Sequence, residues 1–305
     1  MNSVSMKNEL SGQVTEMEKL MSLHPTSPKV KLHSHPVAPP SHLHSQHTVA
    51  ILALCSLLCG PAFTHDVRQQ NEAQTNVTRL ANIQKNWGSK MNSPGAEIIL
   101  KETRRERTPQ GTAVYYRLSA SGLATHEVYT LFSTTLALNN VPALEGITFD
   151  RSGLAVCAGT QGTCTGDKPN DPIDLAIFAA KGEPKRFAVM SADKESKAFT
   201  YVVPFPILGN DRNCTAEAIL LTPKAEAVLI HGSGFVPQTE VHFTGLSEQE
   251  TQQNDSKADA EGNLYQVALP YVKGQSHGKT KITLQSNACN PSLSFDWGPD
   301  CCKNQ

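Results

Sequence analysis

Hydrophobic and polar residues follow a different pattern before and after about residue 96. Beyond this point, apolar and polar positions alternate over short runs, and Gly, Pro, Asn and Asp residues separate the runs. A period of two is typical of half-buried β-strands. The runs that predict strands span residues 113–118, 128–132, 147–149, 154–157, 173–178, 186–190, 199–203, 227–230, 241–243, 264–269, 281–284 and 293–297. This part of the chain is therefore expected to be all-β.

The clearest strand-turn-strand signal lies in residues 227–243, where two apolar runs flank a Gly-Ser-Gly turn. A fainter copy of this signal occupies residues 117–131. Both copies are followed by an Asp-x-x-Gly sequence, starting at Asp150 and at Asp259, which favours a type I turn between strands. Because further similarities follow in the same order in both halves, we interpret the chain as an internal duplication.

Three motifs of the second half carry a resemblance to a known family. They are Gly232-Ser233-Gly234-Phe235 with Pro237, then Val241-His242-Phe243, then Ala258-Asp259-Ala260-Glu261-Gly262. In these motifs the second half resembles a bacterial immunoglobulin-like domain of the kind found in exported proteins. The resemblance implies two tandem immunoglobulin-like β-sandwiches, over residues 96–221 and 223–300, that serve adhesion, spacing or ligand presentation without catalytic residues. The Cys…Trp…Cys pattern of antibody domains is missing, which leaves the strand order open.

The chain before residue 96 divides into three segments. Residues 1–47 are rich in His and Pro and predict a disordered leader. Residues 48–58 form an apolar run that is too short to span a bilayer comfortably but fits the hydrophobic part of a signal peptide. Small residues near its end favour cleavage between Ala62 and Phe63. An uncleaved membrane anchor within residues 48–62 is the alternative.

Residues 63–95 are interpreted as a polar linker between the membrane and the globular part. Val77, Leu80, Ile83 and Trp87 recur at spacings near three and four, which also fits one amphipathic helical segment. The composition of the segment, rich in Asn, Gln, Lys and Ser, favours the tether over the helix.

Two of the eight cysteines, Cys55 and Cys59, lie in or beside the apolar run. If the chain is exported, the other six are disulfide candidates: Cys157, Cys164, Cys214, Cys289, Cys301 and Cys302. Cys157 and Cys164 bracket the start of an insertion over residues 158–172, and a crosslink there would restrain its Gly and Thr residues. We therefore predict a Cys157–Cys164 disulfide and a partner for Cys214 within the C-terminal group of cysteines. A zinc site is the alternative, but paired C-x-x-C knuckles are missing.

Composition sets limits on partners. The chain has 305 residues, 39% of them hydrophobic and 18% charged, which is enough for about two domains. Its net charge of −1 gives no general attraction to nucleic acid. Two Trp and 6% aromatic residues give little support for a stacking platform that would bind sugars or bases.

Candidate chemistry is sparse. Ser233 lies in a sequence that superficially resembles a hydrolase nucleophile turn, but the G-x-S-x-G spacing and the following helix are missing, so its glycines are interpreted as turn residues. Asp255, Asp259 and Glu261 fit a solvated turn better than a calcium loop. The basic group Lys101, Arg104, Arg105 and Arg107 is interrupted by glutamates and fits a solvated face.

Neighbouring histidines of the leader, His33 with His35 and His42 with His44, could share a metal ion, but nothing nearby would complete a coordination shell. The sequence therefore predicts no catalytic residue, metal site or cofactor, and it does not locate a binding site.

Together these features predict a non-enzymatic exported or cell-surface protein that binds an unknown protein or glycan. Its exposed loops, above all the insertion after Cys157, are the expected recognition surface. The alternative is a structural spacer or accessory component of an envelope assembly that binds through strand edges. An exported hydrolase is the third hypothesis and has the least support, because no acid, base and nucleophile converge in the sequence.

Overall fold

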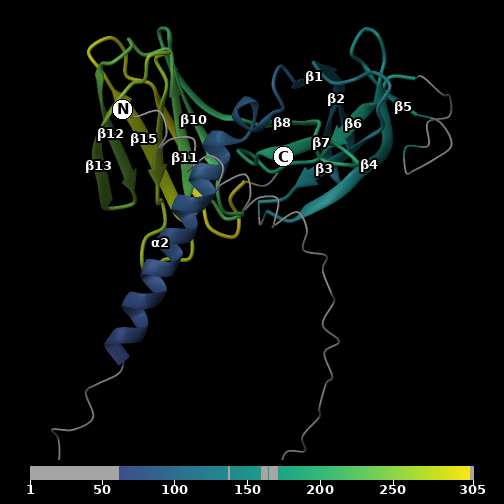
Figure 1. Ribbon diagram of the computed structural model, residues 1–305. Coiled ribbons are helices and arrows are strands. Elements are labelled where there is room, and N and C mark those ends of the chain that lie inside the picture. Colours follow the sequence, from purple (N-terminus) through teal and green to yellow (C-terminus); the bar gives the residue numbers. More distant parts are fainter. Residues whose placement is uncertain (1–61, 137, 159–163, 165–170, 303–305) are drawn as a thin grey trace, which may run out of the picture.

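The computed structural model describes residues 62–136, 138–158, 164 and 171–302 (Figure 1). The predicted leader, the apolar run with Cys55 and Cys59, and residues 303–305 of the tail lie outside the described residues. Most of the insertion after Cys157 also lies outside them. The signal-peptide and leader hypotheses therefore stay predictions.

Helix α2 (Ala62–Asn86) and the short 3-10 helix η1 (Ser89–Met91) precede a long series of strands (Figure 1). No helix in this described part of the chain is long and apolar enough to cross a membrane. The prediction of an all-β chain after residue 96 is confirmed, because every later element of regular structure in the described residues is a strand.

Eight strands form the first sandwich: β1 (Glu97–Thr108), β2 (Gly111–Ser121), β3 (Tyr129–Thr134), β4 (Asn140–Phe149), β5 (Ala155–Cys157), β6 (Asp174–Ile177), β7 (Lys185–Ser191) and β8 (Lys197–Val202). One sheet has the order β1-β2-β6 and the other β5-β4-β3-β7-β8. Buried residues of both sheets share one core; Val114 and Leu118 of β2 meet there with Leu131 of β3 and Ile147 of β4. In β2, buried and partly exposed residues alternate from Val114 to Leu118, so the period of two places one face of the strand in the core.

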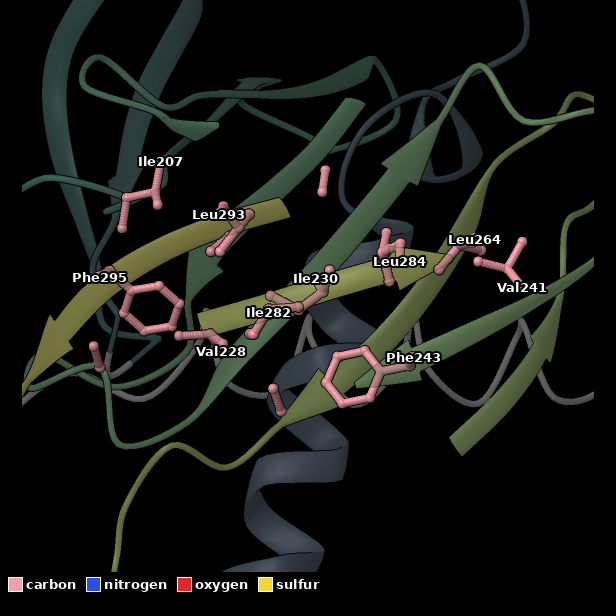
Figure 2. Packing of buried hydrophobic residues seen from close by; sticks show 14 of the residues in the cluster. Ile207, Val228, Ile230, Val241, Phe243, Leu264, Ile282, Leu284, Leu293 and Phe295 are labelled. Carbon is pink, nitrogen blue, oxygen red and sulfur yellow. The ribbon is translucent and has the colours of Figure 1, made fainter. Parts of the chain in front are cut away.

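Eight further strands form the second sandwich: β9 (Ile207–Asp211), β10 (Cys214–Leu220), β11 (Val228–Ser233), β12 (Glu240–Ser247), β13 (Glu250–Lys257), β14 (Leu264–Ala268), β15 (Gly278–Gln285) and β16 (Ser292–Trp297). Their sheets have the orders β14-β11-β10-β9 and β13-β12-β15-β16. Figure 2 shows the core between them, where Val228 and Ile230 of β11 lie among Phe243 of β12 and Ile282 and Leu284 of β15.

The two sandwiches have the same strand order. The sheet β1-β2-β6 corresponds to β10-β11-β14, and β4-β3-β7-β8 corresponds to β13-β12-β15-β16. Strands β5 and β9 are additions at the edges of these shared sheets. All the ladders are antiparallel, which suits a sequence of alternating strands joined by short turns.

The Asp-x-x-Gly turns support the duplication in atomic detail. The main-chain oxygen of Asp150 accepts a hydrogen bond from N–H of Gly153 at 2.9 Å, and its carboxylate accepts from N–H of Leu154 at 2.9 Å. The main-chain oxygen of Asp259 accepts from N–H of Gly262 at 3.2 Å, and its carboxylate accepts from N–H of Asn263 at 2.7 Å. Both turns thus use the same bonds at the same positions of the repeat.

The boundary between the sandwiches differs from the predicted one. Residues 207–220 were assigned to the first sandwich, which was expected to end at residue 221. In the structure, β9 and β10 pair with each other and β10 pairs with β11, so this stretch belongs to the second sandwich. The chain crosses over in residues 203–206, which contain Pro204 and Pro206. A proline cannot donate to a ladder, so the crossing point is where pairing has to stop.

Helix α2 packs on the outer faces of both sandwiches (Figure 1). Val77, Leu80 and Ala81 join a cluster with β10, β11 and β14 of the second sandwich. Ile83 and Trp87 join a cluster with β7 and β8 of the first. The linker interpretation of residues 63–95 differs from this arrangement, because the amphipathic stripe covers two apolar sheet faces instead of remaining in solvent.

Candidate functional site

Ser233 lies at the end of β11, where it pairs with Thr215 of β10. A Cβ atom added to Gly232 would lie 2.9 Å from side-chain atoms of Leu264, Leu284 and Phe235, so close packing requires glycine there. The residues around Ser233 thus serve the core and the strand pairing. They do not form a strand-to-helix nucleophile turn.

The acidic residues near the second turn have structural partners. Asp259 caps its own turn, as described above. Asp255 forms a close ion pair with His242 across the β12–β13 ladder, and this hydrogen bond raises the pKa of His242 above its ordinary value. In the part of the chain that the structure describes, no three His, Cys, Asp or Glu side chains gather in a group that could hold a metal ion.

Three disulfides join the six cysteines after residue 96. The first links Cys157 to Cys164, the pair that their spacing favoured. The second links Cys214 at the start of β10 to Cys289 in the turn between β15 and β16, and so ties the two sheets of the second sandwich together. The third links the neighbours Cys301 and Cys302.

The basic group of β1 is more organised than a solvated face. The guanidinium of Arg104 lies 3.6 Å from the ring centroid of Tyr115 and 3.7 Å from Asp174 of β6. Arg117 of β2 donates two hydrogen bonds to the same carboxylate, at 2.9 and 3.1 Å. Arg105 pairs with Glu102 at 2.7 Å. Two arginines therefore hold Asp174 at the start of β6.

A groove of about 630 Å³ runs along β6 on the side that faces away from β2. Every residue of the stretch 173–178 lines it, and β3, β4 and β7 contribute Ser133, Leu144 and Phe187 from the opposite sheet. Ala176 and Phe178 are exposed beside it. The groove therefore lies at the place where the edge of the three-stranded sheet approaches the other sheet of the sandwich.

The second sandwich is closed at the corresponding place. Its cavity there has only about 80 Å³ and is lined by Gly245, Gln252 and Leu269 among others. The side-chain amide of Gln252 in β13 donates to the carbonyl of Val267 at 3.3 Å and accepts from N–H of Leu269 at 3.3 Å. This amide occupies the edge of β14 as the peptide group of a neighbouring strand would.

The sequence did not locate this groove. Residues 173–178 were predicted as a strand, but nothing in a single strand indicates which edge stays unpaired. The comparison of the two repeats supplies the missing signal. Val141 of β4 pairs with Ser133 as Gln252 of β13 pairs with Gly245, so an apolar residue stands where the second repeat has its amide.

No family model matches this chain, and no curated protein matches it. Among solved structures, the chain is similar to a "tetra-tandem repeat in extending region of large adhesion protein", with 11% identity and a TM-score of 0.22. The similarity covers 69% of this chain and 50% of that one, so the chain spans about half the length of that structure. A TM-score of this size does not establish a common fold.

Proposed function

We propose that this protein is a non-enzymatic binding or adhesion protein that acts outside the cytoplasm through two immunoglobulin-like domains in tandem. The observation that carries this proposal is the strand order that both sandwiches share. Immunoglobulin-like domains place strands A, B and E in one sheet and C, F and G in the other, with C′ beside C. Lettering β1, β2, β3, β4, β6, β7 and β8 as A, B, C, C′, E, F and G reproduces this arrangement.

The disulfides support an oxidising compartment. Such bonds persist in secreted and extracytoplasmic proteins and are rare in the cytosol. Ala62, the residue before the predicted cleavage point, is also the first residue of helix α2, so a mature chain that starts at Phe63 keeps nearly the whole helix. Because most of α2 is retained, the packing of its last turns on both sandwiches is compatible with cleavage at this point.

The junction between the sandwiches favours a second candidate function, a rigid spacer. The loop before β7 lies against β10, where N–H of Leu220 donates to the carbonyl of Gly182 at 2.9 Å. N–H of Lys181 donates to the carbonyl of Cys302 at 3.0 Å. Together with helix α2, these contacts hold the two domains against each other, which suits a spacer as well as it suits a binding protein.

Expression of the full chain with its own leader in an exporting host tests the proposal. Non-reducing mass spectrometry of the exported protein is expected to show an N-terminus at or near Phe63 and no free thiol among the six cysteines after residue 96. A full-length chain that stays in the cytosol with free thiols would contradict the extracytoplasmic role.

Beads coated with the exported protein then separate the two functions. A binding protein is expected to attach the beads to cells that display its protein or glycan partner, and reduction of the disulfides is expected to abolish attachment. A correctly exported and oxidised chain whose beads attach to no such cells would instead favour the spacer. The two measurements thus test compartment and binding separately.

A further inference from the structure

We infer that the groove along β6 binds an extended peptide segment of another protein, which adds to the β1-β2-β6 sheet as a new edge strand. This inference rests on the proposed function, because it assigns one surface and one class of partner to the same binding module. Strand addition of this kind takes its affinity from main-chain hydrogen bonds and its specificity from pockets for alternate side chains.

The pairing of β6 with β2 shows which backbone groups are available. Arg117 is opposite Asp174, and at the next opposed pair N–H of Leu118 donates to the carbonyl of Ile173 at 3.4 Å. Opposed residues of an antiparallel ladder alternate between hydrogen-bonded and non-bonded pairs. Leu175 and Ile177 therefore direct their main-chain groups toward β2, and Asp174 and Ala176 direct theirs into the groove.

These outward main-chain groups have no other segment beside them in the described part of the chain. TOPO order ends at β6 on this side of the sheet, and the neighbouring strand of the opposite sheet, β4, presents Ala143 and Leu144 to the groove. An unpaired N–H and C=O row is a template for a further strand. The side chains of Leu175 and Ile177 stay in the core, so a strand could add without disturbing the packing.

The second sandwich shows how the same edge is closed when it is not used. There the amide of Gln252 bonds to both main-chain groups of the β14 edge, at Val267 and Leu269. In the first sandwich the corresponding residue is Val141, which is 54% exposed and cannot form hydrogen bonds through its side chain. The repeats thus differ by one polar side chain at the position that decides whether the edge is covered.

The size of the edge favours a peptide over a second copy of this chain. β6 has 4 residues, whereas a stable protein–protein interface involves about 20–30 residues on each side. A single extended segment needs far less surface, because its main chain pairs directly with the edge. The exposed carboxylate of Asp171 at the start of the groove adds a preference for a basic residue at that end of the peptide.

The probe is a pool of synthetic peptides of about ten residues with Val, Ile, Leu or Phe at alternate positions and one terminal Lys. The full exported protein is immobilised, and the retained peptides are sequenced and measured by calorimetry. Wild type is expected to retain a subset of the pool. Binding of that subset is expected to slow hydrogen exchange at the amides of Asp174 and Ala176.

Val141→Gln places an amide where the second sandwich has Gln252, and it is expected to weaken binding at least about tenfold. Val128→Gln is the matched control, because Val128 is 55% exposed and precedes the opposite end of β3. This control is expected to bind as wild type does. Ala176→Pro removes one N–H donor that faces the groove and not β2, and it is expected to weaken binding without unfolding the sandwich.

Four results would overturn the inference. They are a pool from which nothing is retained, equal binding by Val141→Gln and Val128→Gln, amides of Asp174 and Ala176 that are already protected in the free protein, and a wild-type dimer that Val141→Gln dissociates. An exported, oxidised chain that fails these tests leaves the proposed function standing. Peptide binding by a chain that stays in the cytosol with free thiols contradicts the proposed function alone.

Discussion

The Nε atom of Arg186 in β7 donates a hydrogen bond of 2.7 Å to Oε1 of Gln84 in helix α2, 102 residues earlier in the chain. Both side chains are buried, with 0% of Arg186 and 2% of Gln84 exposed. The guanidinium also donates to the carbonyl of Thr135 at 3.4 Å. Burial lowers the pKa of Arg186 to about 10, so it is still charged at neutral pH. A buried cation held by amide and carbonyl oxygens depends on each of these acceptors.

Replacing Gln84 with Leu removes an acceptor from this buried charge and keeps a side chain of similar size. We expect Gln84→Leu to lower the free energy of unfolding by about 1–2 kcal/mol, the low end of the range, because Nε2 of Gln84 has no hydrogen-bond partner to lose. Urea unfolding measures the change as a lower midpoint. Asn82→Leu on the exposed side of the same helix is the control, with less than about 0.5 kcal/mol. Equal midpoints for the two variants would contradict a stabilising role of the Gln84–Arg186 bond.

Alkaline pH is expected to destabilise the first sandwich through Tyr129. Burial, assisted by the carboxylate of Glu127, raises the pKa of this phenol from 10.0 to about 12. Below pH 10 the phenol is protonated in both the folded and the unfolded chain, so its contribution to stability is fully present. As the pH rises from 10 to about 12, the unfolded chain loses the proton first, and stability falls.

Tyr129→Phe removes the titrating group and isolates this effect. At neutral pH the variant is expected to lose about 1 kcal/mol, because the hydroxyl bonds to Glu127 at 2.9 Å and to the carbonyl of Ala124 at 3.2 Å are gone. Above pH 10 its stability is expected to fall less steeply than that of wild type. Urea unfolding over a series of pH values compares the two slopes. Parallel slopes above pH 10 would show that Tyr129 does not titrate as expected.

The sequence predicted those strands that place one face in a core and failed at those that do not. In β16, Leu293, Phe295 and Trp297 are buried and alternate with exposed residues, and the strand was predicted with nearly its true ends. Strand β13 contains no apolar residue, pairs only with β12 and is largely exposed, so it has no hydrophobic period to detect. β1 was missed for the same reason beyond Leu100. Such edge strands are held by main-chain bonds, which every residue except proline can form.

The features that bear on function were less predictable than the strands. A charged residue gives no sign in the sequence that it will be fully buried, yet Arg186 is. The stripe from Val77 to Trp87 fitted a helix, but the two apolar faces that it covers exist only after both sandwiches have formed. The open edge of β6 depends on which residue of β4 lies opposite Ser133, and register of this kind is a property of the folded sheet.

The two long-range and short-range disulfides are expected to differ in their contribution to stability. Cys214 and Cys289 are 75 residues apart, and in the chain-entropy account a loop of this length contributes about 4 kcal/mol. Cys157 and Cys164 are 7 residues apart, which corresponds to about 2 kcal/mol. Alanine replacement of each pair, followed by urea unfolding of the oxidised proteins, measures both. A larger loss for the Cys157–Cys164 pair would show that strain or the insertion, and not loop closure, controls the effect.

The glycine of each Asp-x-x-Gly turn is expected to be indispensable for a second reason besides its backbone conformation. Gly153 and Gly262 have φ values of +81° and +78°, and a Cβ atom at either would overlap a main-chain oxygen, that of Ala120 or that of Phe235. Gly274 has a φ of +87° but open space around it. Gly274→Ala therefore isolates the cost of the left-handed conformation, about 1 kcal/mol.

Gly153→Ala and Gly262→Ala must in addition displace backbone, so each is expected to cost about 3 kcal/mol or more. Urea unfolding of the three variants gives the comparison. Because the same contact recurs in both repeats, the two turn variants are expected to lose similar amounts. Losses no larger than that of Gly274→Ala would mean that the turns relax without effort, and the close approach of turn and strand would then not be what fixes the Asp-x-x-Gly sequence in both halves of the chain.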